Sequence, residues 1–217
     1  MIKIYHYFQF IFAFMLLNFV GCKPKLYDPA VTHLTNDDVV GITFSSPTGI
    51  VELRSLTFLS PQVATKITAE CSHLCLNGLE EVSDETAEIL AASKCSIEMP
   101  SLKTLDNIPL SKKLAQQEGV LLLNEILDLN PEIAKAVATH NGGLSLNGLT
   151  ELSEENATAL ATHKGPLWLW GLKTMSGKVL KALLDHDGDI YFRDLSDLSR
   201  TYSAVIKKKW GFEAKKN

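Results

Sequence analysis

The chain has 217 residues, with 21 Lys and Arg against 25 Asp and Glu, and a formal net charge of −4. This length is sufficient for one domain with a sizeable hydrophobic core. The slightly acidic balance disfavours a general nucleic-acid binder, because such a protein needs a basic face.

The first residues of the chain have the composition of an export signal. Phe8–Leu17 is apolar except for Gln9, and one cation, Lys3, precedes it. An apolar run of this length is short for a membrane-spanning helix and typical of a signal peptide. We therefore expect residues 1–21 to be a signal peptide. Its removal takes away Lys3 and changes the net charge from −4 to −5.

The next residues, Phe19-Val20-Gly21-Cys22, resemble the lipobox of bacterial lipoproteins. In that family a signal peptidase cuts before the cysteine, and the thiol receives a diacylglycerol. The resemblance therefore implies lipidation of Cys22, whereas the alternative is an ordinary signal peptide or an uncleaved anchor. The residue after Cys22 is Lys23 rather than an aspartate, and in this respect the sequence resembles lipoproteins that are sent to an outer membrane. The resemblance implies a lipid-anchored protein of the bacterial cell envelope, in the outer membrane where the cell has one.

Most of the remaining chain repeats one pattern. Residues 22–38 are expected to be the lipidated cysteine and a tether, and residues 39–50 an N-terminal cap. The repeated units then begin at Val51, Leu74, Ile97, Leu121, Leu144, Leu167 and Ile190. Every interval is 23 residues, except that the unit beginning at Ile97 has 24. A fixed period over this length predicts a solenoid of stacked units.

Each unit is predicted to contain a short strand and a helix. Its first and third residues are apolar, as in Leu144 and Leu146, which indicates a strand with one buried face. The tenth residue is usually a serine, such as Ser153, at the expected N-cap of a helix. Apolar residues at the fourteenth and seventeenth positions, such as Ala157 and Leu160, form one buried helical stripe.

This pattern resembles the leucine-rich repeat superfamily, and more closely bacterial repeat proteins with units of the form L-x-L-x-G-L-x-x-L-S-x-x-x-A-x-x-L-A-x-H-x-G. The resemblance covers residues 51–200 and is weakest over Ile97–Gly119, which contains Pro100 and Pro109. It implies an α/β repeat solenoid: a right-handed arc of about seven units, each with one short parallel strand and one helix. The buried asparagine ladder of ordinary leucine-rich repeats has no equivalent, because the sixth position is Leu or Ile. Residues 201–217 are expected to form a C-terminal helix over Thr201–Trp210 and a basic tail.

Two columns of residues mark the predicted end of the helix. The twenty-second position is glycine in three successive units: Gly142, Gly165 and Gly188. These glycines predict left-handed helix caps. The twentieth position is histidine in the same units: His140, His163 and His186. Such a column suggests a metal site, but no carboxylate or thiol recurs beside it, so contacts with free helix-end carbonyls are expected instead. We predict no metal and no cofactor.

Three cysteines follow Cys22. Cys71 and Cys95 fall in corresponding loops of adjacent units, so they are either bridged or left as neighbouring free thiols. Cys75 would be a spare thiol on the open surface of the sheet. A nucleophilic cysteine needs an activating group, and His73 has no predicted reason to face Cys75. We therefore expect Cys75 to pack rather than to react.

The second and fourth residues of each strand should point away from the core, onto the open face of the sheet. In the last two units these residues are Trp168, Trp170, Tyr191 and Arg193. We expect Trp168 beside Tyr191, and Trp170 beside Arg193. Exposed aromatic rings next to an arginine are typical of a binding hot spot. The alternative is that these side chains only pack on one another.

Together these patterns predict a membrane-tethered binding or scaffolding module rather than an enzyme. A solenoid presents one broad face, which suits a protein or polysaccharide partner in the envelope or outside the cell. The alternatives are an envelope hydrolase or transferase that uses Cys75 or the aromatic residues, and a purely structural envelope protein. The sequence contains no Gly-rich phosphate loop and no Ser/His/Asp set.

Overall fold

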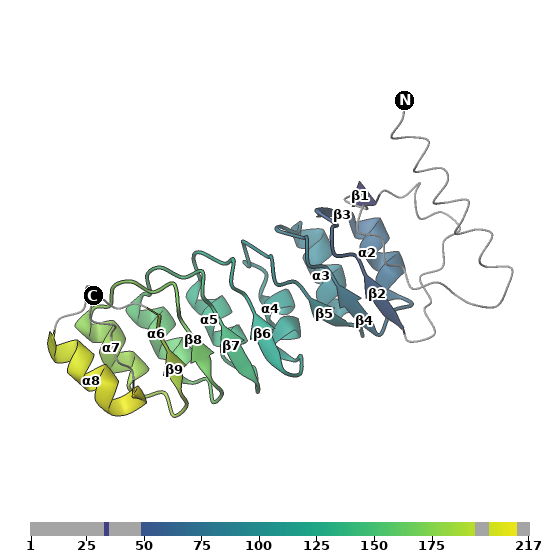
Figure 1. Ribbon diagram of the computed structural model, residues 1–217. Coiled ribbons are helices and arrows are strands. Elements are labelled where there is room, and N and C mark those ends of the chain that lie inside the picture. Colours follow the sequence, from purple (N-terminus) through teal and green to yellow (C-terminus); the bar gives the residue numbers. More distant parts are fainter. Residues whose placement is uncertain (1–32, 35–48, 194–199, 212–217) are drawn as a thin grey trace, which may run out of the picture.

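The computed structural model describes residues 33–34, 49–193 and 200–211. The predicted signal peptide, Cys22, the predicted tether apart from His33–Leu34, and residues 39–48 of the predicted cap lie outside them. The described residues form an α/β fold in which short strands alternate with helices (Figure 1). The strands are β1 (His33–Leu34), β2 (Ile50–Glu52), β3 (Phe58–Leu59), β4 (His73–Cys75), β5 (Ser96–Glu98), β6 (Val120–Leu122), β7 (Gly143–Ser145), β8 (Leu167–Trp168) and β9 (Ile190–Tyr191). The helices are α2 (Pro61–Thr68), α3 (Asp84–Ala92), α4 (Ile108–Ala115), α5 (Pro131–Val137), α6 (Glu154–Ala161), α7 (Gly177–Leu183) and α8 (Arg200–Trp210).

The strands form two main parallel sheets, with the orders β2-β4-β5 and β6-β7-β8-β9. Their register aligns the first residues of the predicted units. Val51 lies opposite Leu74, for example, and Leu144 lies opposite Leu167. A separate parallel pair joins β1 to β3. Because β1 falls within residues 22–38, part of the predicted tether is a strand; two residues are too few to show a periodic pattern.

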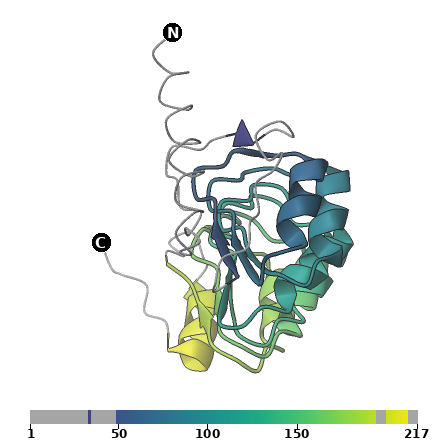
Figure 2. The ribbon, with the colours of Figure 1, turned by 90° about the vertical axis from the view of Figure 1, so that its right-hand side faces the viewer.

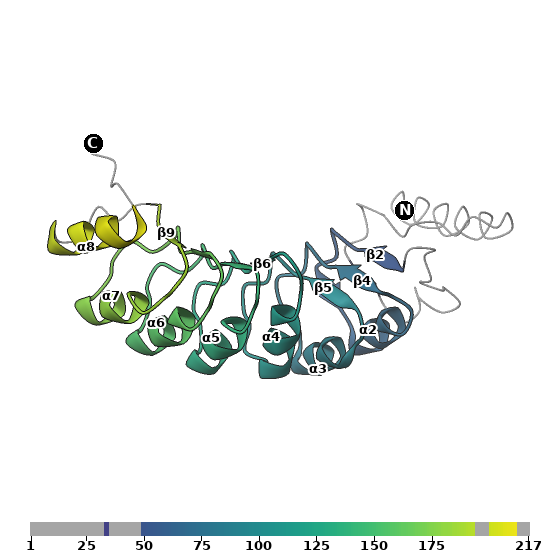
Figure 3. The ribbon, with the colours of Figure 1, turned by 90° about the horizontal axis from the view of Figure 1, so that it is seen from below.

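The helices α2 to α7 lie side by side in chain order along one side of the strands (Figures 1 and 3). The core fills the space between the two layers. In the unit that begins at Leu144, the strand residues Leu144 and Leu146 and the helix residues Ala157 and Leu160 are all fully buried. The predicted apolar positions therefore form the contact between strand and helix, as expected for residues with these two periodicities.

Hydrogen bonds at the helix starts follow the predicted pattern. Four serines are N-caps, and each accepts a hydrogen bond from a backbone N–H three residues later: Ser60, Ser83, Ser153 and Ser176. Asparagines replace serine before α4 and α5, where Asn107 and Asn130 are the caps. Each is followed by a proline in the first turn of the helix, where a missing N–H costs no helical hydrogen bond.

The two main sheets meet at a break in the ladder, between β5 and β6, which are not paired among the described strands. Elsewhere the third residue of a unit donates its N–H to the next strand, as Leu146 does to Trp168 O at 3.0 Å. The unit before the break contains the additional residue and Pro100. Helix α4 nevertheless packs on both α3 and α5, so the helix layer continues past this ladder break.

A short asparagine ladder runs along the fourth position of the units. Asn124 Oδ1 accepts the N–H of Asn147 at 3.3 Å, and Asn147 Oδ1 accepts the N–H of Trp170 at 3.0 Å. The sixth position holds buried Leu or Ile, as the sequence predicts, and this partly exposed ladder at the fourth position is a feature that we do not predict from the sequence. Asn77 Oδ1 is buried with no partner among the described residues. The residue one unit further on is Pro100, which has no N–H to donate.

The glycine column does not form the left-handed caps that we predict from sequence. Among the described residues, only Gly49, Gly119 and Gly211 have positive φ. A Cβ on Gly188 would lie 2.8 Å from the carbonyl oxygen of Gly165, and one on Gly165 would overlap the carbonyl oxygen of the glycine a unit earlier. These positions are glycine because the backbones of successive units touch there.

Helix α8 closes the C-terminal end, as the sequence predicts, and lies apart from the layer of α2 to α7 (Figure 2). Its Ile206 is fully buried. The indole of Trp210 packs edge-on against Phe192, with ring centroids 5.9 Å apart, and donates to Gly188 O at 3.2 Å. Trp210 therefore shields the last unit from solvent.

Candidate functional site

Two aromatic rings lie stacked at the C-terminal end of the open strand face. The register of β8 and β9 places Trp168 opposite Tyr191. The ring centroids are 5.5 Å apart and the ring planes differ by 13°. Such a pair contributes about 0.5–1.5 kcal/mol beyond the area that it buries. The expected neighbourhood of Trp168 and Tyr191 is thus present, and Tyr191 stays 43% exposed.

The stacked pair belongs to a larger apolar surface. A Cβ on Gly143 would lie 2.5 Å from Trp168 Cζ3 and 3.4 Å from Val120 Cγ2, so the indole lies over Gly143 and beside Val120. Leu122 points to the same face two residues along β6. Val120, Leu122 and Trp170 are 50%, 45% and 46% exposed. We call Val120, Leu122, Trp168, Trp170 and Tyr191 the aromatic patch. Its aliphatic members are not among the residues that we predict from the sequence.

The paired strands end before the second predicted pair, Trp170 and Arg193. Strand β8 ends at Trp168 and β9 ends at Tyr191, so the register stops before the fourth position. Both side chains are exposed. Within the described part of the chain, no hydrogen bond or ring contact joins them. That they lie side by side therefore stays a prediction, because these strands are two residues shorter than it assumes.

A polar cluster lies at the other end of the open face, on β4 and β5. His73 and Cys75 are two residues apart on one strand, so both side chains point to the same side, and Cys75 lies opposite Glu98. His73 Nε2 is 3.3 Å from Glu98 Oε1. The Cys75 thiol donates to Glu98 Oε2 at 3.8 Å. The expectation that His73 does not face Cys75 is wrong. The alternation of side chains along a strand predicts that the two share one face.

Cys75 is held as a neutral thiol. Burial raises its pKa, and the nearby carboxylates of Glu98 and Glu52 raise it further, to about 11. Each of these effects disfavours the thiolate. Because the thiolate is the reactive form, this environment is the opposite of what a cysteine nucleophile needs. The cluster therefore gives no support to catalysis by Cys75 alone.

The histidine column is a buried stack rather than an open site. The rings of His140 and His163 are parallel within 5°, with centroids 6.3 Å apart, and His186 continues the stack. His140 Nδ1 lies 3.0 Å from Ala115 O, and its Nε2 lies 3.1 Å from Gly119 O. These carbonyls belong to the preceding unit. His163 Nδ1 lies 3.3 Å from Ala138 O in the same way, so these two histidines join successive units at their helix ends. His163 Nε2 and both ring nitrogens of His186 are buried without a hydrogen-bond partner among the described residues.

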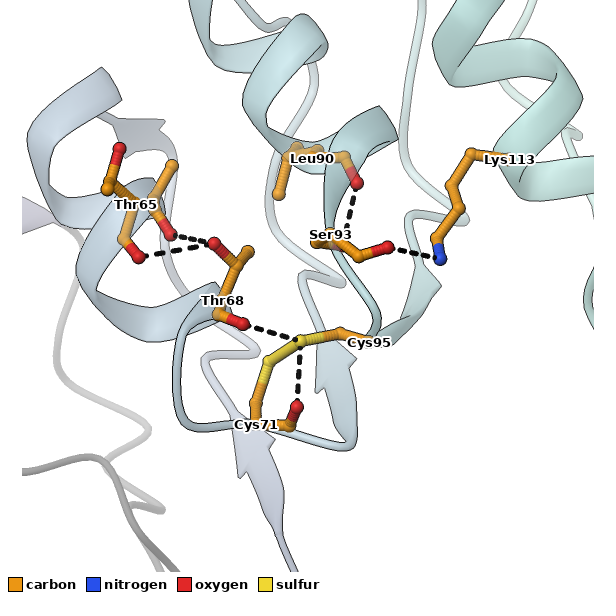
Figure 4. Close-up of a disulfide and its surroundings, with 8 residues drawn as sticks. Thr65, Thr68, Cys71, Leu90, Ser93, Cys95 and Lys113 are labelled. Atoms are coloured by element: carbon orange, nitrogen blue, oxygen red, sulfur yellow. Dashed lines mark hydrogen bonds between the residues drawn. A yellow bond between two sulfur atoms is a disulfide. The ribbon is translucent and has the colours of Figure 1, made fainter.

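Cys71 and Cys95 form a disulfide, with their Cα atoms 5.7 Å apart (Figure 4). It joins the loop after α2 to the loop after α3. Cys95 Sγ also lies 3.0 Å from Cys71 O. Nearby, Lys113 Nζ donates to Ser93 O at 2.8 Å, which anchors α4 to the same loop. Cys75 remains the free thiol among the described cysteines.

Comparison with known proteins gives no relative: no family model matches the chain, and neither a curated protein nor a solved structure matches it significantly. None of the helices in the described residues combines the length and the hydropathy that crossing a membrane requires.

Proposed function

We propose that this protein is a binding module of the bacterial cell envelope, tethered through a lipid on Cys22, and that its units form a leucine-rich-repeat-like solenoid. The alternation of strand and helix, the 23-residue alignment of the strands and the row of helices support the solenoid. The lipobox-like Phe19-Val20-Gly21-Cys22 supports the anchor and the outer-membrane location.

The aromatic patch is the observation that carries the binding function. Four of its apolar side chains, those of Val120, Leu122, Trp168 and Tyr191, lie on paired strands, and Trp170 lies in the turn after β8. Large aromatic side chains lose little conformational entropy when a partner docks, so they are effective anchors. The preceding unit has Ser145 and Asn147 in place of Trp168 and Trp170. Stacking of the units therefore does not require aromatic residues at these positions. The partner class is an envelope protein or polysaccharide.

The double variant Trp168→Ser, Trp170→Asn tests this proposal, because it copies the preceding unit. The immobilised full chain, kept in mild detergent, is compared with the variant for retention of envelope proteins and of purified envelope polysaccharide. We expect the variant to lose retention while it stays folded, with a stability loss of about 0.5–1.5 kcal/mol, the value of the aromatic pair that it removes. Leu127→Asn is the matched control, because Leu127 is an exposed apolar residue outside the patch. Equal retention by wild type and double variant contradicts the proposal.

The anchor is tested separately. In Cys22→Ala we expect no incorporation of labelled fatty acid, and a protein that is released from the membrane fraction or incorrectly processed. Fatty-acid labelling that persists in this variant contradicts the lipobox assignment and leaves the aromatic patch unaffected.

A further inference from the structure

We propose that His73, Cys75 and Glu98 form a binding site for one Zn²⁺ or a chemically similar divalent cation on the open strand face. This site is independent of the aromatic patch, because it lies on β4 and β5 rather than on β6 to β9 (Figure 1).

The spacing of the donor atoms supports the proposal. One ligand atom from each of the three residues lies within 4.8 Å of the other two. Tetrahedral zinc, with bonds of about 2.0–2.3 Å, holds its ligand atoms about 3.3–3.5 Å apart. The observed separations involve the two different oxygens of Glu98: His73 Nε2 is 3.3 Å from Oε1, and Cys75 Sγ is 3.8 Å from Oε2. An ion can therefore be held after small side-chain rotations.

The backbone fixes two of the three relationships. His73 and Cys75 share one face of β4 because they are two residues apart. Glu98 is held opposite Cys75 by the parallel register, and His73 lies opposite Ser96. The Cys71–Cys95 disulfide joins the loops that lead into these two strands. A site on paired strands is more rigid than one on loops, so little ordering is needed when the ion binds.

The charges and donor types favour a zinc-like ion over others. Imidazole nitrogen, thiolate sulfur and carboxylate oxygen are the three donors that Zn²⁺ accepts in proteins. Mg²⁺ and Ca²⁺ select oxygen ligands and would not use Cys75 or His73. Binding breaks the S–H bond of Cys75, forms a sulfur–zinc bond and releases the proton to solvent. The thiolate and the Glu98 carboxylate then balance the two positive charges of the ion.

The site is open on one side. Cys75 is buried, whereas the side chains of His73 and Glu98 are 31% and 51% exposed. Three protein ligands leave a fourth position of a tetrahedral ion directed to solvent. Glu52 lies opposite Cys75 on β2, but its carboxylate pairs with Arg54 Nε at 3.4 Å. A water or a group from a partner would therefore complete the coordination.

Metal titration of the full chain in mild detergent, after treatment with a chelator, tests the proposal. We expect one Zn²⁺ per chain in a competition assay with a chromophoric chelator. Bound Co²⁺ should show a thiolate-to-cobalt charge-transfer band in the near ultraviolet. Cys75→Ser should abolish this band, and Glu98→Gln should weaken Zn²⁺ binding by at least about tenfold. Glu151→Gln is the control, because Glu151 is an exposed carboxylate outside the cluster.

Three outcomes would overturn the proposal: no binding at stoichiometric zinc, a cobalt spectrum without a thiolate band, or Glu98→Gln that binds as tightly as wild type. Glu98 is half-exposed and its replacement keeps the shape of the side chain, so this variant remains informative if Cys75→Ser does not fold. Circular dichroism establishes which variants are folded before they are titrated.

Discussion

The indole of Trp168 lies directly over Gly143, so that a single methyl group on Gly143 would lie 2.5 Å from the indole Cζ3. Gly143 does not have positive φ, and alanine is compatible with its backbone. The glycine is therefore needed for the ring above it rather than for the strand itself. Gly143 therefore positions the aromatic patch although it contributes no side chain to it.

Gly143→Ala should displace the indole and disturb its stacking with Tyr191. We expect a change in the near-ultraviolet circular dichroism, weaker retention of the envelope partner, and a loss of stability of about 0.5–1.5 kcal/mol, the value of one aromatic pair. The same substitution in a Trp168→Ser background should change neither retention nor the spectrum. If it has its full effect there, the glycine acts through the backbone.

Leu146→Ala tests the strand register. Leu146 is fully buried, and its N–H donates to Trp168 O at 3.0 Å. Removal of a buried leucine side chain should lower the free energy of unfolding by about 2–5 kcal/mol, measured by urea denaturation. Leu122, on the strand of the preceding unit, offers a comparison: its side chain is exposed, so Leu122→Ala should cost much less stability. A loss of under about 0.5 kcal/mol for Leu146→Ala is a surface value and would mean that the register is wrong.

The disulfide should contribute measurably to stability. Cys71 and Cys95 are 24 residues apart in the chain, and a loop of this length corresponds to about 3–4 kcal/mol in the chain-entropy model. In the double variant Cys71→Ala, Cys95→Ala the free energy of unfolding, measured by urea denaturation, should be lower by this amount. Reductant should lower the midpoint of the wild type and of Cys75→Ser equally. A midpoint that does not respond to reductant would show that the bridge contributes nothing.

Stability should fall when the solution is acidified through the range where histidine titrates. Burial lowers the pKa of both His163 and His186, and neighbouring histidines act in the same direction on His163, as Lys209 does on His186. The unfolded chain, with histidine pKa values near about 6.5, therefore binds more protons below that pH. Stability from these groups is complete above about pH 6.5 and is lost as the pH falls toward the lowered values.

Urea midpoints at about pH 7.5 and about pH 5.5 measure this effect, because most carboxylates remain charged at both values. The wild type should be less stable at the lower pH. The variant His163→Leu, His186→Leu should lose most of this difference, whatever its absolute stability. An equal difference in wild type and variant would assign the pH dependence to other groups.

The arrangement of strands and helices follows from residues whose pattern has only one physical solution. Leu144 and Leu167 align because a 23-residue period and strand alternation fix both position and face. Ser153 caps its helix because the hydroxyl satisfies a free N–H. The glycine column has two physical explanations, since glycine serves equally for a left-handed cap and for close backbone contact. The carbonyl of the preceding unit, which touches Gly165, shows that close contact is the reason here.

The candidate sites were predictable where neighbours are related by register alone. Trp168 and Tyr191 were placed together because both are second residues of adjacent strands. The paired register stops before Trp170 and Arg193, because strand length depends on where the hydrogen-bond ladder ends, which no residue pattern states. The same register places Glu98 beside Cys75, and the period of two adds His73. That cluster was readable in the sequence, but only once carboxylates on neighbouring strands were considered together.

The ladder break between β5 and β6 interrupts the layer of strands, whereas the layer of helices is continuous. Across it, the described residues are coupled by the packing of α4 against α5 and by His140, whose ring nitrogens lie beside the carbonyl oxygens of Ala115 and Gly119. Because strand hydrogen bonds are missing at this boundary among the described strands, the two halves should unfold with less mutual dependence than neighbouring units elsewhere. Amide protons on the strands at the break should exchange with solvent faster than those in the middle of either sheet. Opening of the half that holds His73, Cys75 and Glu98 would then depend less on the half that holds the aromatic patch.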